Sequence, residues 1–284
     1  MNWILLFSSD ILETCKNVFS NKFSKDTLKN ETDVYKFNMC LYVGAFLMLG
    51  FFKSAPVSVY TALLALAFAA VTAGAQHFYV KALNIGSMSF TSFMQGSNLV
   101  IPALYGVIFL KEDASVLKIC AIAALVFSMA LVLDVKKEKI HMKWFAFALL
   151  SMIFTGFVGV LQTVHQMSQH SAELIGFLRF AFLYSVLFNL ILWKKSETKE
   201  KATFKTKSCA VVSALVSGIF IGAVNIINLY LAGVMPKVIF YPLVNGGLII
   251  ATLFSAVIFF KEKLNLKQCI GIVIGVAAMG IISI

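Results

Sequence analysis

The chain has 284 residues, of which 60% are hydrophobic and only 13% are charged. A soluble domain carries about a quarter charged residues, so the composition excludes a soluble globular protein and predicts an all-α membrane protein with many spans. The formal net charge is +11. Its lysines lie in short segments between apolar runs, which indicates membrane orientation rather than nucleic-acid binding.

Ten apolar stretches follow one another along the chain, most of them close to the roughly 20 residues that a membrane-spanning helix needs. The predicted spans are residues 3–23, 37–53, 57–80, 87–110, 115–134, 144–166, 172–193, 209–232, 238–260 and 266–284. The first span is unusually polar and the second is short. No segment between them has the composition of a soluble domain.

The first span carries ionisable side chains in its middle, at Asp10, Glu13 and Lys16, followed by Asn17. At about 100° per residue these polar residues share one side of a helix, opposite an apolar side. One interpretation is a helix that lines a hydrated pocket, where Glu13 and Asp10 bind a cationic solute or a proton. An amphipathic helix in the membrane interface and a structural Glu13–Lys16 pair are the alternatives.

Further hydrogen-bonding residues lie inside the later spans of the first half. Gln76 and His77 fall late in the third span, and Gln95 and Asn98 fall in the fourth. Within a membrane such side chains bind solutes or join helices to one another, and the sequence fits both roles. We include all of them in the predicted substrate site.

The second half contributes Arg179 in the seventh span, Asn225 and Asn228 in the eighth, and Tyr241 and Asn245 in the ninth. Arg179 is expected either to reach the headgroups or to meet an anion inside the protein. The asparagines suit a substrate site or contacts between helices. Tyr241 is expected to offer an aromatic wall that favours a cation.

Orientation is predicted from the basic residues of the connections. Eighteen lysines follow odd-numbered spans, whereas only Lys53, Lys111, Lys118 and Lys237 lie on the other side. Because basic loops stay in the cytoplasm, the odd-numbered connections should be cytoplasmic and both termini outside. If the first segment only lies on the membrane, the N-terminus moves inside.

The two halves of the chain repeat each other. At an offset of 150 residues, "FLKED" at 109–113 meets "FFKEK" at 259–263, and seven of the 23 positions in 90–112 are identical to their counterparts. We therefore predict two five-helix repeats, at 1–140 and 141–284. An odd number of spans per repeat inserts the second half upside down, an arrangement typical of secondary transporters.

These features make the sequence resemble the drug/metabolite transporter superfamily, in particular its EamA-type ten-span members. The resemblance is carried by Phe-x-Lys-Glu at the end of both fourth spans, the lone Arg179 in "FLRFAF", and two five-span halves. The opening "WILLFSSDILETCKNVFSNKFSK" is similar to the first span of small multidrug resistance proteins, whose essential glutamate corresponds to Glu13. Such relatives usually keep both termini in the cytoplasm, and the lysine distribution here departs from that.

The resemblance implies a secondary active transporter of a small organic solute, working by alternating access in the cytoplasmic membrane. The two acids of the first span suggest an amine or cationic compound, whereas Arg179 and the asparagines suggest a carboxylated or nucleotide-like metabolite. Protons are the candidate coupling ion, and the protein would act as a monomer or homodimer without a cofactor or metal. The sequence contains no phosphate-binding loop and no hydrolytic motif, so an enzyme is not expected. The alternative is a flippase for a lipid-linked substrate, or a channel-like protein of the same fold.

Overall fold

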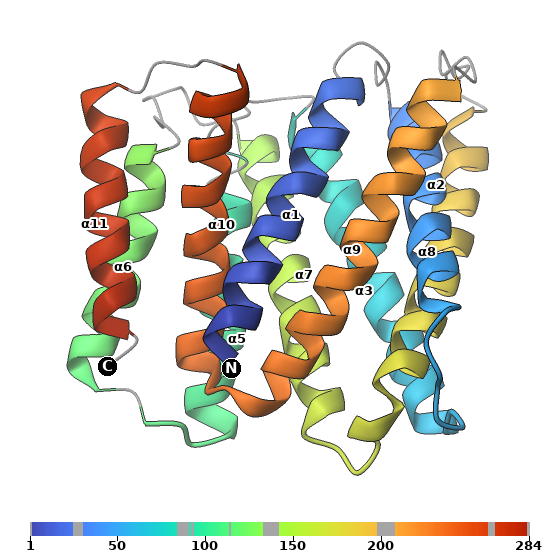
Figure 1. Ribbon diagram of the computed structural model, residues 1–284, viewed down its shortest axis with the longest axis horizontal. Coiled ribbons are helices and arrows are strands. Elements are labelled where there is room, and N and C mark those ends of the chain that lie inside the picture. The colour runs from blue at the N-terminus through green and yellow to red at the C-terminus, as the bar shows by residue number, and fades with distance from the viewer. Residues whose placement is uncertain are drawn as a thin grey trace. The chain divides into compact units, whose positions relative to one another are not determined.

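The computed structural model describes residues 2–24, 31–83, 91, 94–113, 115–132, 142–197, 208–260 and 265–282, and its regular structure there is helical (Figure 1). The α-helices are α1 (Asn2–Ser24), α2 (Glu31–Leu49), α3 (Val59–Leu83), α5 (Val100–Phe109), α6 (Val116–Val132), α7 (Met142–Gln166), α8 (Leu174–Glu197), α9 (Ser208–Val234), α10 (Lys237–Phe260) and α11 (Leu266–Ile282). Short 3₁₀ turns, η1 (Ser97–Leu99) and η2 (Ser171–Glu173), precede α5 and α8.

The predicted class, an all-α membrane protein, is confirmed. In the described part of the chain, four helical stretches are long and apolar enough to cross a membrane, namely Val59–Ala82, Met142–Gln166, Ser171–Glu197 and Ala210–Val234. Shorter apolar helices occupy Met94–Phe109, Val116–Leu131 and Leu266–Ile282. Each of them lies within a span that the apolar runs predicted.

Two compact units make up the structure, and each combines parts of both sequence halves. The first contains Trp3–Ala73 and Val164–Gly233, and the second contains Gly74–Thr163 and Val234–Ile284. Helices α3 and α7 therefore contribute to both units. The predicted boundary between the two repeats, at residues 140 and 141, divides the sequence and not these compact units, and it stays a prediction.

In the first unit, α2 and α8 pack side by side in opposite directions. Arg179, early in α8, donates to the carbonyl of Leu49 at the end of α2, whereas the Lys36 ammonium near the start of α2 lies 5.5 Å from the centre of the Trp193 ring late in α8. Helix α1 is antiparallel to α9 in the same way, since Ser9 bonds Asn228 while Phe19 stacks on Phe220.

The second unit repeats this pattern. Helices α3 and α7 are antiparallel, because the Ser151 hydroxyl donates to the Ala75 carbonyl while Phe78 stacks on Phe147. Helices α6 and α11 pack against each other, and Glu112, three residues after the end of α5, accepts a hydrogen bond from the backbone N–H of Lys237 at the start of α10. The fit is close, because a side chain at Gly275 of α11 would contact the Ser128 hydroxyl of α6.

The helix pairs match the predicted inverted repeat. The second, fourth and fifth spans of one half each pack against the corresponding span of the other half, as α2 with α8, α5 with α10 and α6 with α11. In the remaining pairs, the first helix of one half packs against the third helix of the other half, as α1 with α9 and α7 with α3. Corresponding helices that run antiparallel are what a two-fold axis in the membrane plane produces.

Candidate functional site

The polar side of α1 faces the protein, and its apolar side is exposed. Ile4, Phe7 and Ile11 are each more than 60% exposed, as lipid-facing residues of a membrane helix are, whereas Ser9 and Asp10 are buried. A helix of this kind is apolar outside and polar inside, which reverses the usual pattern of a water-soluble protein. The structure therefore encloses Ser9 and Asp10 of the polar side, and their role as lining residues stays a prediction.

Asp10 is the most isolated ionisable group on this face. Its side chain is only 4% exposed, and Oδ1 accepts no hydrogen bond from the described residues. The neighbouring hydroxyls are engaged elsewhere, because Thr14 Oγ1 donates to the Asp10 backbone carbonyl over 2.7 Å and Ser9 donates to α9. Asp10 is thus a buried carboxyl group without a charge partner on the described part of its own unit.

Glu13 has a different environment. Its carboxylate forms an ion pair with the Lys16 ammonium one turn along α1, and both side chains are partly buried. A paired carboxylate in the membrane is compensated by its partner, so Glu13 and Lys16 together add no net charge to the polar face. The Glu13–Lys16 pair predicted as an alternative is present, while Asp10 lies outside it.

Helix α9 supplies the amide groups next to this face. The Asn228 side-chain oxygen accepts a 2.6 Å hydrogen bond from the Ser9 hydroxyl, and the Asn225 amide donates to the Ile221 carbonyl on its own helix. Helix α9 contains no charged residue. The Asn17 side chain lies outside the described residues.

Arg179 binds backbone rather than a carboxylate. Its guanidinium donates to the carbonyls of Leu49, Gly50 and Phe52, where α2 ends. The last carbonyls of a helix lack intrahelical partners and carry partial negative charge, so the arginine caps α2 from a neighbouring helix. Both sequence-based interpretations, headgroup contact and an anion partner, differ from this placement.

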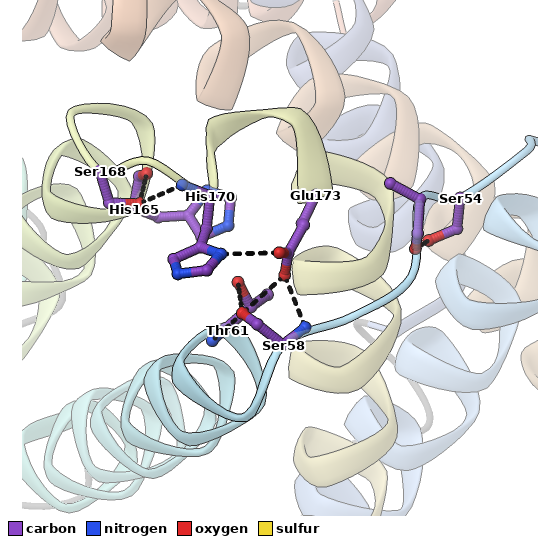
Figure 2. A network of polar contacts seen from close by, with 8 residues as sticks. Ser54, Ser58, Thr61, His165, Ser168, His170 and Glu173 are labelled. Atoms are coloured by element: carbon purple, nitrogen blue, oxygen red, sulfur yellow. Dashed lines mark hydrogen bonds and ion pairs between the residues drawn. The ribbon is translucent and has the colours of Figure 1, made fainter.

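A second polar cluster joins the start of α3 to the turn between α7 and α8 (Figure 2). Glu173 accepts hydrogen bonds from the backbone N–H and the hydroxyl of Ser58, at 2.8 and 2.9 Å, and its other oxygen lies 2.7 Å from His170 Nδ1. A carboxylate at the start of a helix satisfies an orphan N–H and favours the helix dipole. Glu173 and Arg179 therefore hold the two ends of the α2–α3 connection.

His165 is fully buried beneath this cluster. Its ring stacks on Phe177 with centroids 4.3 Å apart, and its Nδ1 lies 3.0 Å from the Gln166 amide nitrogen. Its packing against Phe177 makes it part of the interior of the first unit.

The remaining predicted site residues lie in the second unit. Tyr241 is buried, and its hydroxyl donates to the Gly159 carbonyl over 2.5 Å and lies 3.0 Å from the Thr163 hydroxyl. Asn245 donates to the Tyr241 carbonyl, which is one turn back along α10 and close to Pro242. Tyr241 thus attaches α10 to α7 near a proline, and its hydroxyl is already occupied.

The amides and the imidazole of the first half complete this second group. Asn98 donates to the Gln95 carbonyl over 2.6 Å, just ahead of α5, and His77 meets the Phe78 ring edge-on. Gln76 is partly buried beside it on α3. The structure therefore distributes the predicted residues over both units, with Asp10, Glu13, Arg179, Asn225 and Asn228 in the first.

Glu112, which the sequence marked only as part of a repeated motif, has a defined role. Its carboxylate accepts the backbone N–H groups of Lys237 and Val238, at 2.6 and 3.1 Å, and so caps the start of α10. A side chain at Gly106 would lie 2.6 Å from that carboxylate, which explains the glycine. The counterpart Lys261–Glu262 falls outside the described residues.

Metal binding receives no support from the described residues, which contain no group of three or more histidine, cysteine, aspartate or glutamate side chains suited to an ion. The polar residues of α1 and α9 described above are instead hydroxyls, amides, the Glu13–Lys16 pair and the Asp10 carboxyl group.

Comparisons with known proteins agree with this architecture. A sequence profile of the EamA-like transporter family matches residues 19–134 and 142–284. A crystal structure, described only as that of a protein, superimposes with a TM-score of 0.74 at 9% identity, covering 99% of this chain and 96% of the other. At that identity the likeness concerns the fold alone. No curated protein matches the chain.

Proposed function

Because the chain belongs to the EamA-like transporter family, we propose that it moves a small organic amine or cation across the cytoplasmic membrane by alternating access. Membership makes it a membrane transporter of the drug/metabolite type. The cationic solute, the secondary active mechanism and the coupling to protons are our proposal. The isolated carboxyl group of Asp10 is the observation that carries it.

The argument rests on charge compensation. Removing an ion from water costs several kcal/mol in proteins unless a counter-charge or strong hydrogen bonds replace the solvent, and charged residues inside membranes usually mark pathways for ions or solutes. Glu13 has Lys16 as its counter-charge. Asp10 has none within the described part of its unit, so it is expected to hold a proton or a cation from outside the chain.

Neutral groups around Asp10 favour an amine over a metal ion. The same face of α1 carries the Ser9 hydroxyl, which donates to the Asn228 amide oxygen, and both oxygens can accept N–H donors without adding charge. One carboxyl group that binds either a proton or the solute couples their transport. The proton must leave the carboxyl group before the solute binds, and the solute must leave before the proton returns. We place Asn225 on the same side, whereas Glu13 is compensated by Lys16 and lies outside the proposed binding group.

Binding can be tested on the purified full-length protein by thermal unfolding in the presence of a library of amines, quaternary cations and anionic metabolites. A ligand that binds the folded state raises the melting temperature. We expect cations to do so in the wild type and not in Asp10→Asn. The control is the double variant Glu13→Gln/Lys16→Met, which removes a neutral pair and should keep the response.

Stabilisation by anions alone, or by cations equally in Asp10→Asn, would contradict the proposal. A response only to phospholipids or lipid-linked compounds would favour the flippase alternative.

A further inference from the structure

Unpaired polar atoms gather at the interface between α2 and α8. Six buried side-chain nitrogen or oxygen atoms lack a hydrogen-bond partner in the described part of the chain, and four of them are Asn38 Nδ2, Ser185 Oγ, Asn189 Oδ1 and Trp193 Nε1. Ser185 and Asn189 are almost completely buried, at 1% and 2% exposure. Buried polar groups are nearly always hydrogen-bonded in proteins, so these four atoms form a candidate binding site for a small polar ligand.

These atoms share one seam between the two helices. At about 100° per residue, Asn189 and Trp193 lie within roughly 20° of Phe182 around α8, and Phe182 stacks on Tyr42 of α2. Asn38 lies one turn from Tyr42 and therefore faces α8 as well. Since Lys36 contacts Trp193, the antiparallel register puts Asn38 level with Asn189.

The spacing of the groups suits water. Ser185, Asn189 and Trp193 follow each other at four-residue intervals, which is about 6 Å along a helix. Two hydrogen bonds of about 2.8 Å through one water molecule span that distance. The free atoms include donors (Asn38 Nδ2 and Trp193 Nε1), an acceptor (Asn189 Oδ1) and a hydroxyl, and water is the small ligand that serves all of them.

We infer that the α2–α8 seam holds a file of water molecules that runs from Trp193, near the end of α8, to Ser185 at its middle. Asn38 and Asn189 bond the file from the two sides. The file gives water access from one end of the α2–α8 pair to the centre of the first unit. It is a site separate from Asp10, so it does not depend on the proposed solute.

Hydroxyl-radical footprinting by X-ray pulses tests the inference directly, because the pulse splits bound water into hydroxyl radicals that oxidise the side chains beside it. In the full-length protein we expect Phe182, which flanks the seam, to be oxidised several-fold faster than Phe240. These two side chains are 2% and 1% exposed, so exposure to bulk solvent does not separate them. Equal rates for the two phenylalanines would overturn the water file.

Substitution of Asn189 provides a second test. In a dry seam, Asn189→Leu removes an unsatisfied group and raises the melting temperature, whereas in a hydrated seam it breaks the file and lowers the melting temperature by several degrees. The same variant should reduce oxidation of Phe182 to the rate of Phe240. A stabilised Asn189→Leu protein would contradict the inference. So would a double-mutant cycle in which Asn38 and Asn189 are energetically coupled while Phe182 shows no enhanced oxidation, because that result indicates a direct hydrogen bond between the two amides.

Discussion

Replacing Arg179 distinguishes a structural role from a role in binding. The guanidinium makes charge-assisted hydrogen bonds to three carbonyls at the end of α2, including 2.9 Å to Leu49 and 3.3 Å to Gly50. Such bonds contribute about 1.5–3 kcal/mol each when buried. Arg179 is only half-buried, and water can replace part of its contacts with the carbonyls. We therefore expect Arg179→Met to lower the free energy of unfolding by about 2–4 kcal/mol in total.

That loss should lower the melting temperature of the purified protein by on the order of 5–10 °C. Arg179→Lys should lie between the wild type and Arg179→Met, because a lysine keeps the charge but cannot reach several carbonyls at once. Lys53→Met is the matched control, since Lys53 is an exposed cation in the same connection. An Arg179→Met protein as stable as this control, but unable to bind an anionic solute, would refute the capping role and restore the anion site.

Other parts of the fold give further predictions. Glu112→Gln removes the charge that caps α10 and should cost about 1–2 kcal/mol in a thermal unfolding assay, whereas exposed Asp113→Asn should cost almost nothing. Gly218→Leu forces a side chain into the backbone of α2 and should unfold or strongly destabilise the protein, while Gly280→Leu, with nothing within 4 Å, should be tolerated in the same assay. A single cysteine at Ser196 should react only with a reagent that reaches the cytoplasm, and labelling from outside would reverse the orientation predicted from the lysines.

The spacing of apolar and polar residues in the sequence predicted the long helices and the buried side of α1. The apolar runs identified helices long enough to span a membrane, and the polar stripe of the first span predicted which side of α1 is buried. Ile4 and Phe7 face outward while Asp10 is enclosed, as the helical wheel requires. The repeat in sequence likewise predicted antiparallel pairs of corresponding helices, because an odd number of spans reverses the second half.

Hydrogen bonds from side chains to backbone groups of other helices produce no periodic pattern in the sequence. The partners of Arg179 are carbonyl groups, which every residue possesses, so nothing in the sequence could indicate that this arginine ends α2. The same holds for Glu173 at the start of α3 and for Glu112 at the start of α10. The backbone groups that these two carboxylates cap are distant from them in the chain, so no local pattern indicates the contact.

The role of Asp10 also needed three-dimensional information. Asp10 and Glu13 lie on the same side of a helical wheel, and either fits a membrane carboxylate. The side-chain contacts separate them, because Lys16 pairs with Glu13 and the Ser9 hydroxyl turns to Asn228. The resemblance to small multidrug resistance proteins emphasised Glu13, whereas the structure favours Asp10 as the uncompensated acid.

Proton movement driven by a solute gradient tests the central proposal most directly. Proteoliposomes containing the wild-type protein and an internal pH dye should change their internal pH when a stabilising cation is added outside. Asp10→Asn should abolish this signal, while Glu13→Gln/Lys16→Met should retain it. A full signal from Asp10→Asn proteoliposomes would contradict the assignment of the exchangeable charge to Asp10.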